Sequence, residues 1–244
     1  MSSDLKILPV KDLKDDKNNK KTNFKLNPIL MGADKKGNFK PFCALFVAPP
    51  RSGKTNMINN LLYSEWFGYK NIFDQIILFS PTIANDTTSG RFIMEDPDIT
   101  VISENLDQVD DYIEALADIQ KEAEPDEREE VLIILDDMLG LLPKKGFLDN
   151  LASKYRHYRI SLIVTTQSFR SIGCVLRYCA NYYVIWKTHN KKEKEKIVEE
   201  LSGNFKDFET LMEVATDKRY EFLYLDLERI KAYCCFHTLL WSKD

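Results

Sequence analysis

The residues whose types and spacing best indicate chemistry lie near position 50, between two regular segments. An apolar run over residues 42–47 precedes them, and a helix-compatible run over residues 56–63 follows. This strand–loop–helix context is the one that a phosphate-binding loop needs. The loop reads Ala48, Pro49, Pro50, Arg51, Ser52, Gly53, Lys54 and Thr55. We predict that these residues, with Asn56 at the start of the helix, bind the phosphates of a nucleotide.

Each residue type in this loop has a physical role at its position. Gly53 lets the backbone come close to an anion, and the backbone N–H groups of the loop and of the helix start can point at phosphate oxygens. Lys54 brings a mobile positive charge to the β- and γ-phosphates, and the Thr55 hydroxyl is a ligand for Mg²⁺. Ala48 stands where such loops usually have their first glycine. Because alanine tolerates positive φ poorly, we expect the chain to enter the loop with negative φ.

A second set of candidate residues follows the segment 131–135. Its five consecutive branched apolar residues are typical of a central parallel strand, and Asp136 and Asp137 come directly after it. In open α/β sheets ligands bind at the carboxyl edge of the strands, where this pair would lie. Successive side chains of an extended chain diverge, so the two carboxylates can act differently. Asp136 is predicted to hold Mg²⁺ through its water shell, and Asp137 to orient or deprotonate the attacking water.

The third signal is the polar end of another apolar segment, residues 162–168. Gln167 lies at its tip, where a glutamine beside a γ-phosphate can hold the lytic water or sense the phosphate. An arginine that reaches the γ-phosphate bound by a neighbouring subunit would stabilise the charge of the transition state. The arginines near this segment are Arg156, Arg159, Arg170 and Arg177. A solvated surface contact is the ordinary alternative for each of them.

The remaining pattern predicts the elements that position these groups. Strands are predicted at residues 42–47, 75–80, 99–102, 131–135, 162–166 and 182–186, and helices at residues 56–66, 106–123, 148–158, 191–201 and 205–214. Segments 220–227 and 231–236 alternate and predict a C-terminal β-hairpin. Strands that alternate with helices imply an α/β fold with a mostly parallel central sheet flanked by helices on both faces.

Composition bounds the organisation of the chain. With 244 residues, of which 44% are hydrophobic, it can form one large domain or two small ones. Residues 1–38 are polar and lysine-rich, so we expect a flexible tail there and a folded domain over residues 39–244. No apolar run reaches membrane-spanning length and no secretory signal is visible, so we expect neither secretion nor a membrane partner. The five cysteines lack a framework spacing, which favours a reducing compartment and buried thiols over a zinc site at Cys234 and Cys235.

The net charge of −4 is segregated along the chain. Residues 1–40 carry ten lysines and five aspartates, whereas residues 104–130 carry twelve acidic and two basic side chains. The lysine-rich tail is either a plain flexible segment or a basic arm that touches DNA or a capsid protein. An acidic helix can be the solvated face that turns away from any polyanion. Net charge therefore neither supports nor excludes a nucleic-acid partner.

The ordered set of motifs resembles the FtsK–HerA superfamily of DNA-pumping ATPases. Within it, the chain is most similar to the genome-packaging ATPases of large nucleocytoplasmic DNA viruses and their virophages. The similarity covers residues 41 to about 190. It is carried by the loop at 48–55, the acidic pair at 136–137, the Arg-His pair at 156–157 before an Ile-Ser strand, the Thr-Gln-Ser at 166–168 and the Leu-Arg at 176–177.

The resemblance implies a RecA-like fold, ATP and Mg²⁺ as cofactors, and a ring of identical subunits, usually a hexamer. It also implies ATP-driven translocation of double-stranded DNA into a capsid, with capsid or portal proteins as further partners, in the host cytoplasm or in the virion. The trans-acting arginine of the family falls first on Arg156 and second on Arg177. Many members have glutamate where this chain has Asp137, and this difference, like Ala48, leaves the rate of hydrolysis open.

Two other functions share the phosphate loop. A nucleoside or small-molecule kinase needs an acceptor pocket and often an arginine-rich lid, and the order of the acidic pair and the glutamine favours water as the acceptor instead. A nucleotide-dependent assembly switch with little turnover is the second alternative. Lys144 and Lys145 are candidate pore residues for contact with DNA phosphates, although a solvated turn is the commoner role of such a pair.

Overall fold

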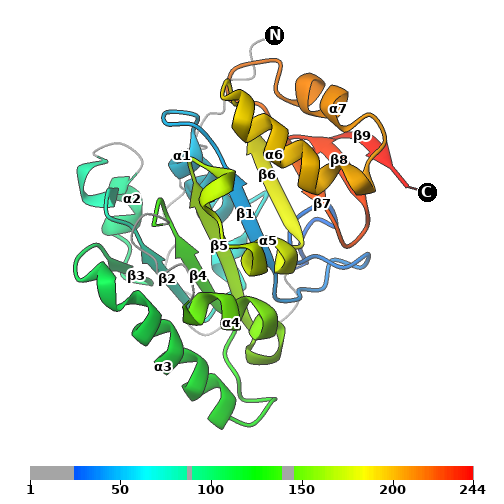
Figure 1. Ribbon diagram of the computed structural model, residues 1–244. Coiled ribbons are helices and arrows are strands. Elements are labelled where there is room, and N and C mark those ends of the chain that lie inside the picture. Colours follow the sequence, from blue (N-terminus) through cyan, green and yellow to red (C-terminus); the bar gives the residue numbers. More distant parts are fainter. Residues whose placement is uncertain (1–24, 87–89, 139–145, 244) are drawn as a thin grey trace.

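A mixed β-sheet forms the centre of the protein (Figure 1). The computed structural model describes residues 25–86, 90–138 and 146–243, and within them the strands pair in the order β3-β2-β4-β5-β1-β6-β7-β8-β9. Their bounds are β1 (Cys43–Val47), β2 (Gln75–Phe79), β3 (Ile99–Ile102), β4 (Val131–Leu135), β5 (Ile160–Thr166), β6 (Tyr182–Trp186), β7 (Phe222–Asp226), β8 (Lys231–Cys234) and β9 (Thr238–Ser242).

The strands from β3 to β6 in this order run parallel, and β7, β8 and β9 continue the sheet in antiparallel pairing. This arrangement confirms the predicted α/β fold with a mostly parallel central sheet. The predicted C-terminal hairpin is present as β7 and β8, and β9 extends it. The sequence analysis did not predict β9, because this edge strand is only partly buried and lacks the continuous apolar signal of a central strand.

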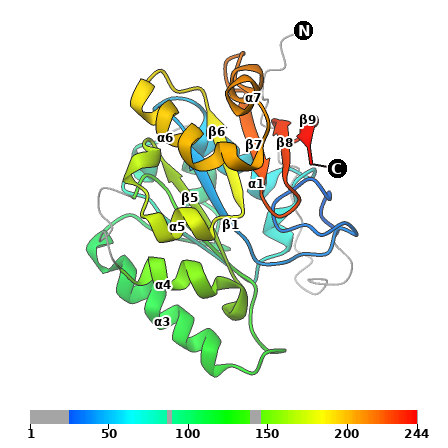
Figure 2. The ribbon, with the colours of Figure 1, turned by 45° about the vertical axis from the view of Figure 1, so that its right-hand side comes forward.

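Helices cover both faces of the sheet. Within the described residues the α-helices are α1 (Lys54–Tyr63), α2 (Gly90–Met94), α3 (Val109–Glu122), α4 (Phe147–Lys154), α5 (Cys174–Cys179), α6 (Lys191–Leu201) and α7 (Phe208–Ala215). In Figure 1, α4, α5 and α6 lie in front of the strands, and the turned view of Figure 2 shows α3 beside α4 on that side. No helix in the described part of the chain is both long and apolar enough to cross a bilayer.

Side-chain alternation along β1 divides the apolar interior into two cores. Cys43, Leu45 and Val47 belong to the first core, with side chains from α3 to α7. Ala44 and Phe46 belong to the second core, with side chains from α1 and α2. The central strands are therefore buried on both faces, which explains their continuous apolar sequences.

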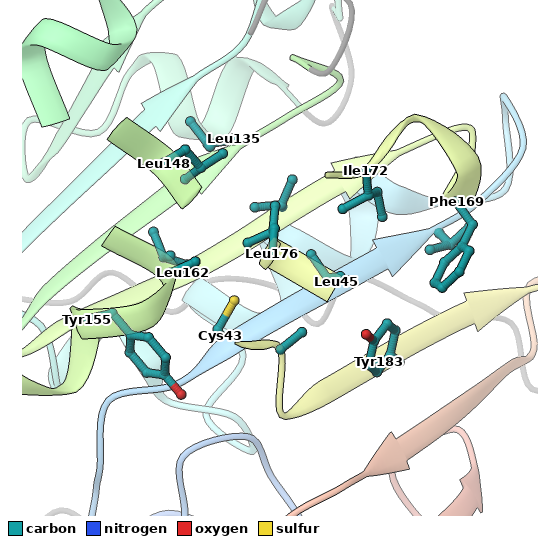
Figure 3. Close-up of a cluster of buried hydrophobic side chains, with 14 of the residues drawn as sticks. Cys43, Leu45, Leu135, Leu148, Tyr155, Leu162, Phe169, Ile172, Leu176 and Tyr183 are labelled. Atoms are coloured by element: carbon teal, nitrogen blue, oxygen red, sulfur yellow. The ribbon is translucent and has the colours of Figure 1, made fainter. Parts of the chain in front are cut away.

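Figure 3 shows part of the first core. Leu148 of α4 and Leu176 of α5 come down from the helical layer toward Leu45, Leu135 and Leu162 of the sheet. This packing fixes the two helices that follow β4 and β5, and so fixes the ends of those strands.

The predicted elements differ from the observed ones mainly at their ends. The helix predicted from residue 56 begins at Lys54, and the segment predicted as one helix over 148–158 is α4 followed by a 3-10 helix, Tyr155–Tyr158. The segment at 106–123 likewise opens with a 3-10 turn, Leu106–Gln108. The short helices α2 and α5 were not predicted, because five or six residues are too few to display a helical period.

The N-terminal part of the described chain corrects a predicted boundary. Residues 1–38 were predicted to form a flexible tail, but Leu26, Leu30 and Met31 are buried in the second core. The Tyr69 hydroxyl donates a hydrogen bond of 2.7 Å to the Met31 carbonyl. These few apolar residues are separated by polar ones and show no periodicity. The polar composition of the segment therefore led to the prediction of a flexible tail. Residues 25–38 belong to the folded domain, and the rest of the predicted tail, residues 1–24, lies outside the described residues.

Leu30→Ala should lower the free energy of unfolding by about 2–5 kcal/mol, because removing a fully buried leucine leaves a cavity. Urea unfolding of the full chain measures this change. Lys35→Ala, at an exposed position of the same segment, is the matched control and should shift stability by less than about 0.5 kcal/mol. If both variants unfold at the midpoint of the parent protein, residues 25–38 are not part of the cooperative domain.

Candidate active site

The phosphate loop opens at the carboxyl edge of the parallel strands. β1 pairs with β5 on one side and β6 on the other, and the Ala48 N–H extends this ladder by donating to the Thr166 carbonyl at 2.9 Å. The chain then leaves the sheet, with positive φ at Arg51 (61°) and Gly53 (96°). Ala48 is not among the described residues with positive φ, which confirms the predicted entry into the loop.

Gly53 joins the loop to α1. Its φ of 96° and ψ of 20° lie in a region that residues with a side chain rarely adopt, and its carbonyl accepts the first helical hydrogen bond from the Met57 N–H at 2.9 Å. The Ser52 hydroxyl donates to the Pro49 carbonyl at 2.6 Å and closes the loop. The N–H groups in the first turn of α1 have no partner within the helix, so they are available to an anion.

The Lys54 side chain is folded back into the loop. Its Nζ donates to the Ala48 carbonyl at 3.2 Å and lies 3.3 Å from Oδ1 of Asp137, and the side chain is only 8% exposed. The predicted phosphate-binding lysine is therefore held in place by two oxygens of the protein.

Asp136 points from the end of β4 into the protein, between two hydroxyl groups. The Thr165 hydroxyl donates to one carboxylate oxygen at 2.6 Å, and the Ser80 hydroxyl donates to the other at 3.1 Å. Asp136 is 4% exposed. Burial raises the pKa of its carboxyl, the hydrogen bond from Thr165 lowers it, and the neighbouring charge of Asp137 raises it.

Asp137 points the other way, toward the loop. Its backbone has a φ of 52°, and its N–H donates to the Thr165 hydroxyl oxygen at 3.1 Å. Its carboxylate contacts Lys54 and accepts a hydrogen bond of 3.2 Å from the side-chain amide of Gln167. The two acids therefore diverge, as predicted, and Thr165 links both to β5. The sequence analysis did not identify Thr165 or Ser80, since hydroxyl residues at strand ends are common.

A cavity of about 580 Å³ lies over the loop. It is lined by every residue from Pro49 to Asn56, and by Asp137 and Gln167. Of the predicted nucleotide-binding residues, Ala48 is buried below the cavity and contributes its carbonyl to Lys54. Five further lining residues were not predicted, because none belongs to a motif: Met57, Asn60, Asp86, Trp186 and Tyr220.

Arg156 lies at the opposite edge of the sheet from the loop. It belongs to the 3-10 helix that precedes β5, whereas Gln167 follows β5. A strand of this length separates its ends by roughly 20 Å. Figure 3 shows the same separation, with Tyr155 near the start of β1 and Phe169 near its arrowhead. Arg156 is 58% exposed and pairs with Glu228 at 2.7 Å.

The other three arginines differ in their exposure and in the contacts that they make within their own chain. Arg177 is 13% exposed, pairs with Glu200 at 2.6 Å and lies 5.5 Å from the centre of the Phe169 ring. Arg159 donates to the Arg128 carbonyl at 3.0 Å, and Arg170, three residues after Gln167 in the sequence, is exposed. The structure thus brings none of the four arginines to the cavity of its own chain. The candidate pore residues Lys144 and Lys145 lie outside the described residues.

Comparisons with known proteins show the family and the fold of this chain. The sequence matches the model of the family described as Poxvirus A32 protein over residues 34–225. No curated protein sequence matches the chain significantly. The crystal structure of B204, the DNA-packaging ATPase from Sulfolobus turreted icosahedral virus, is similar with a TM-score of 0.59 and 17% identity, over 80% of this chain and 98% of that chain.

Two further structures are similar. The genome-packaging NTPase B204 from Sulfolobus turreted icosahedral virus 2, in complex with ATP-γ-S, has a TM-score of 0.57 at 18% identity, over 80% of this chain and 96% of that one. The conjugation coupling protein TcpA of pCW3 has a TM-score of 0.54 at 13% identity, over 76% of this chain and 57% of that one. These similarities confirm the predicted fold, and the family match covers most of the chain. The protein belongs to the Poxvirus A32 protein family.

Proposed function

We propose that this protein is a DNA-packaging ATPase of the A32 and B204 type, which hydrolyses ATP to move double-stranded viral DNA into a capsid. The observation that carries the proposal is the meeting of Lys54, Asp137 and Gln167, from three separate parts of the sequence, at one cavity. Membership of the A32 family and the fold shared with the packaging ATPase B204 support the same function.

The triphosphate of ATP is bound by the loop. The N–H groups of the loop and of the first turn of α1 donate to phosphate oxygens, and the dipole of α1 favours their negative charge. Lys54 then exchanges the Ala48 carbonyl and Asp137 for the β- and γ-phosphates. This exchange releases Asp137, so substrate binding itself frees the carboxylate that the reaction needs.

The residues near the loop fit a magnesium ion. The Thr55 hydroxyl and the Asp136 carboxylate supply oxygen ligands, which Mg²⁺ prefers. Asp136 is a buried acid with a raised pKa, and a nearby cation would offset the cost of its charge. When bound with ATP, Mg²⁺ neutralises phosphate charge and orients the γ-phosphate.

Water attacks the γ-phosphorus from the side of Asp137 and Gln167, the bond from this phosphorus to the β,γ-bridging oxygen breaks, and ADP leaves. Both side chains line the cavity and are joined by a hydrogen bond of 3.2 Å, which supports a shared role on one water. Asp137 accepts the proton of the water or orients it, and Gln167 holds the water and senses the γ-phosphate.

A neighbouring subunit completes the site in this proposal. Arg156 is exposed and lies about 20 Å from the cavity of its own chain, so it can reach a γ-phosphate only across an interface. Such an arginine stabilises the transition-state charge and requires a ring of subunits, for which we propose a hexamer. Arg177 is the second candidate.

The DNA is proposed to pass through the pore of the ring. Contacts there are made to phosphates, so binding depends on salt and little on sequence. Loss of the γ-phosphate contacts shifts the loops that hold the DNA. The proposed place of action is the host cytoplasm or the virion, with a capsid or portal protein as a further partner.

Duplex DNA should stimulate the release of phosphate from ATP by the purified protein, and the stimulation should fall as salt rises. A phosphate-release assay, with particle size measured in parallel, tests this.

Lys54→Ala should abolish turnover, and Asp137→Ala should bind ATP but stall. Transfer of phosphate to a nucleoside with no effect of DNA would indicate a kinase instead. If Asp137→Ala retains full biological function, the protein is an assembly switch.

Arg156→Ala should bind ATP normally and lose turnover, because its own loop is intact while the arginine that it offers to its neighbour is missing. Mixing it with Lys54→Ala subunits should restore part of the activity, since the intact loop of one variant then meets the intact arginine of the other. Phosphate release across a mixing series measures the recovery. A mixture as inactive as its components would place Arg156 outside the reaction, and Arg177→Ala is the parallel variant.

Asp136→Asn should stabilise the nucleotide-free protein at pH 7 while abolishing hydrolysis. Burial raises the folded-state pKa of Asp136, so protonation favours the folded state and its ionised form destabilises it. This destabilisation develops as the pH rises from the unfolded-state pKa of Asp136 through its folded-state pKa. The amide of the variant carries no charge and therefore removes it. Urea unfolding should show a gain at pH 7 that disappears near pH 4. A loss of stability at pH 7 would contradict this assignment of charge.

A further inference from the structure

The strand order gives the cavity two chemically different sides. β1, which leads into the phosphate loop, lies between β5 and β6. On the β5 side, the cavity is lined by Asp137 and Gln167, the groups that act on the γ-phosphate. On the β6 side, it is lined by Trp186, the last residue of β6, and by Tyr220, which precedes β7. A nucleotide whose γ-phosphate faces β5 therefore directs its nucleoside toward the aromatic side.

Tyr220 is held at this place by its neighbours. β7 pairs with β6 so that Phe222 lies opposite Trp186, with their rings 5.1 Å apart, and this pairing anchors the turn that carries Tyr220. A ring carbon of Tyr220 lies 3.6 Å from the position that a Cβ on Gly53 would occupy, so the ring adjoins the loop. Trp186 is 3% exposed, and its ring packs against those of Phe46 and Phe222.

The backbone and the exposure of Tyr220 are unusual for a tyrosine with only a structural role. Its φ is 69°, in the left-handed region that aromatic residues rarely adopt. Its side chain is 40% exposed although it lines the cavity, and the Arg219 guanidinium lies 4.6 Å from the ring centre. The ring thus offers an open, fixed aromatic surface next to the phosphate cradle.

We propose that Tyr220 is the platform on which the base of the bound nucleotide stacks, and that this contact makes the site prefer purine over pyrimidine triphosphates. The proposal rests on the proposed function, because it takes a nucleoside triphosphate as the ligand. Stacking on an aromatic ring needs no base-edge hydrogen bonds, and it strengthens with the overlapping ring area, so the larger purines gain more. The Arg219 guanidinium lies over the ring and holds it by its attraction to the π system.

Binding of ATP, CTP and inorganic tripolyphosphate to the full chain with Mg²⁺ tests the proposal. The parent protein should bind ATP several-fold more tightly than CTP. Tyr220→Ala should weaken ATP binding by about tenfold or more and CTP binding less, because a base–aromatic stack is lost. Tripolyphosphate has no base, so its affinity should change by less than about twofold. Tyr220→Phe keeps the ring and should bind ATP within about threefold of the parent protein.

Tyr178→Ala is the matched control, since Tyr178 is an exposed tyrosine on α5 that does not line the cavity, and it should change none of these affinities. Tyr220→Gly relieves the backbone strain while removing the ring, so it should weaken ATP binding as Tyr220→Ala does.

Equal weakening of ATP and tripolyphosphate binding by Tyr220→Ala would overturn the proposal and would indicate that Tyr220 only maintains the shape of the loop. Unchanged ATP affinity would also overturn it. If the parent protein binds tripolyphosphate but does not distinguish ATP from CTP, the proposed purine preference and the proposed role of Tyr220 are wrong, and the proposed ATPase function is unaffected. If the parent protein binds neither nucleotide nor tripolyphosphate, the proposed ATPase function fails as well.

Discussion

The register of three central parallel strands is the constraint on which the site depends. β4, β5 and β1 pair so that Leu135 lies opposite Val164, and Val47 lies opposite Thr166. All three strands therefore end at the same edge, where their polar residues follow. A slip of β5 by one residue would turn Thr165 to the other face and remove the hydroxyl that Asp136 and Asp137 share. The two apolar cores, which fix the faces of these strands, are thus what holds Asp136, Asp137 and Thr165 in position.

The charged side chains of the site contact partners of their own chain. Asp136 contacts two hydroxyl groups, and Lys54 contacts Asp137. Asp136 is deeply buried and accepts hydrogen bonds from two neutral hydroxyl groups, so its charge is costly and favours a cation close by. Asp137 is more accessible and pairs with Lys54. The lysine and this acid thus offset each other's charge. Divergence of two adjacent acids lets one strand end place one carboxylate among buried hydroxyl groups and the other beside the loop.

The residues predicted from the sequence line the loop and the β5 side of the cavity, whereas Trp186 and Tyr220 on its β6 side were not predicted. Lys54, Asp137 and Gln167 directly follow strands or a loop that composition alone identifies, and parallel pairing brings such ends together. Tyr220 lies in a turn between a helix and an antiparallel strand, and only the pairing of β7 with β6 brings it to the loop. Leu26 and Leu30 were missed for a related reason, because a buried segment with irregular backbone has no period that sequence can reveal. Thr165 was visible as part of a strand, but its link to both acids depends on register, which the sequence does not specify residue by residue.

The two edges of the sheet determine what a single chain can do. The loop, Asp137 and Gln167 line one cavity at the carboxyl edge, whereas Arg156 lies at the amino edge, paired with Glu228. β5 is rigid and buried along its whole length, so no rearrangement of one folded chain brings Arg156 to its own cavity. An arginine at that edge either has no part in the reaction or acts on the nucleotide of another subunit. In the second case hydrolysis depends on contact between subunits, and an interface that opens and closes around each ATP supplies the coupling that a motor needs.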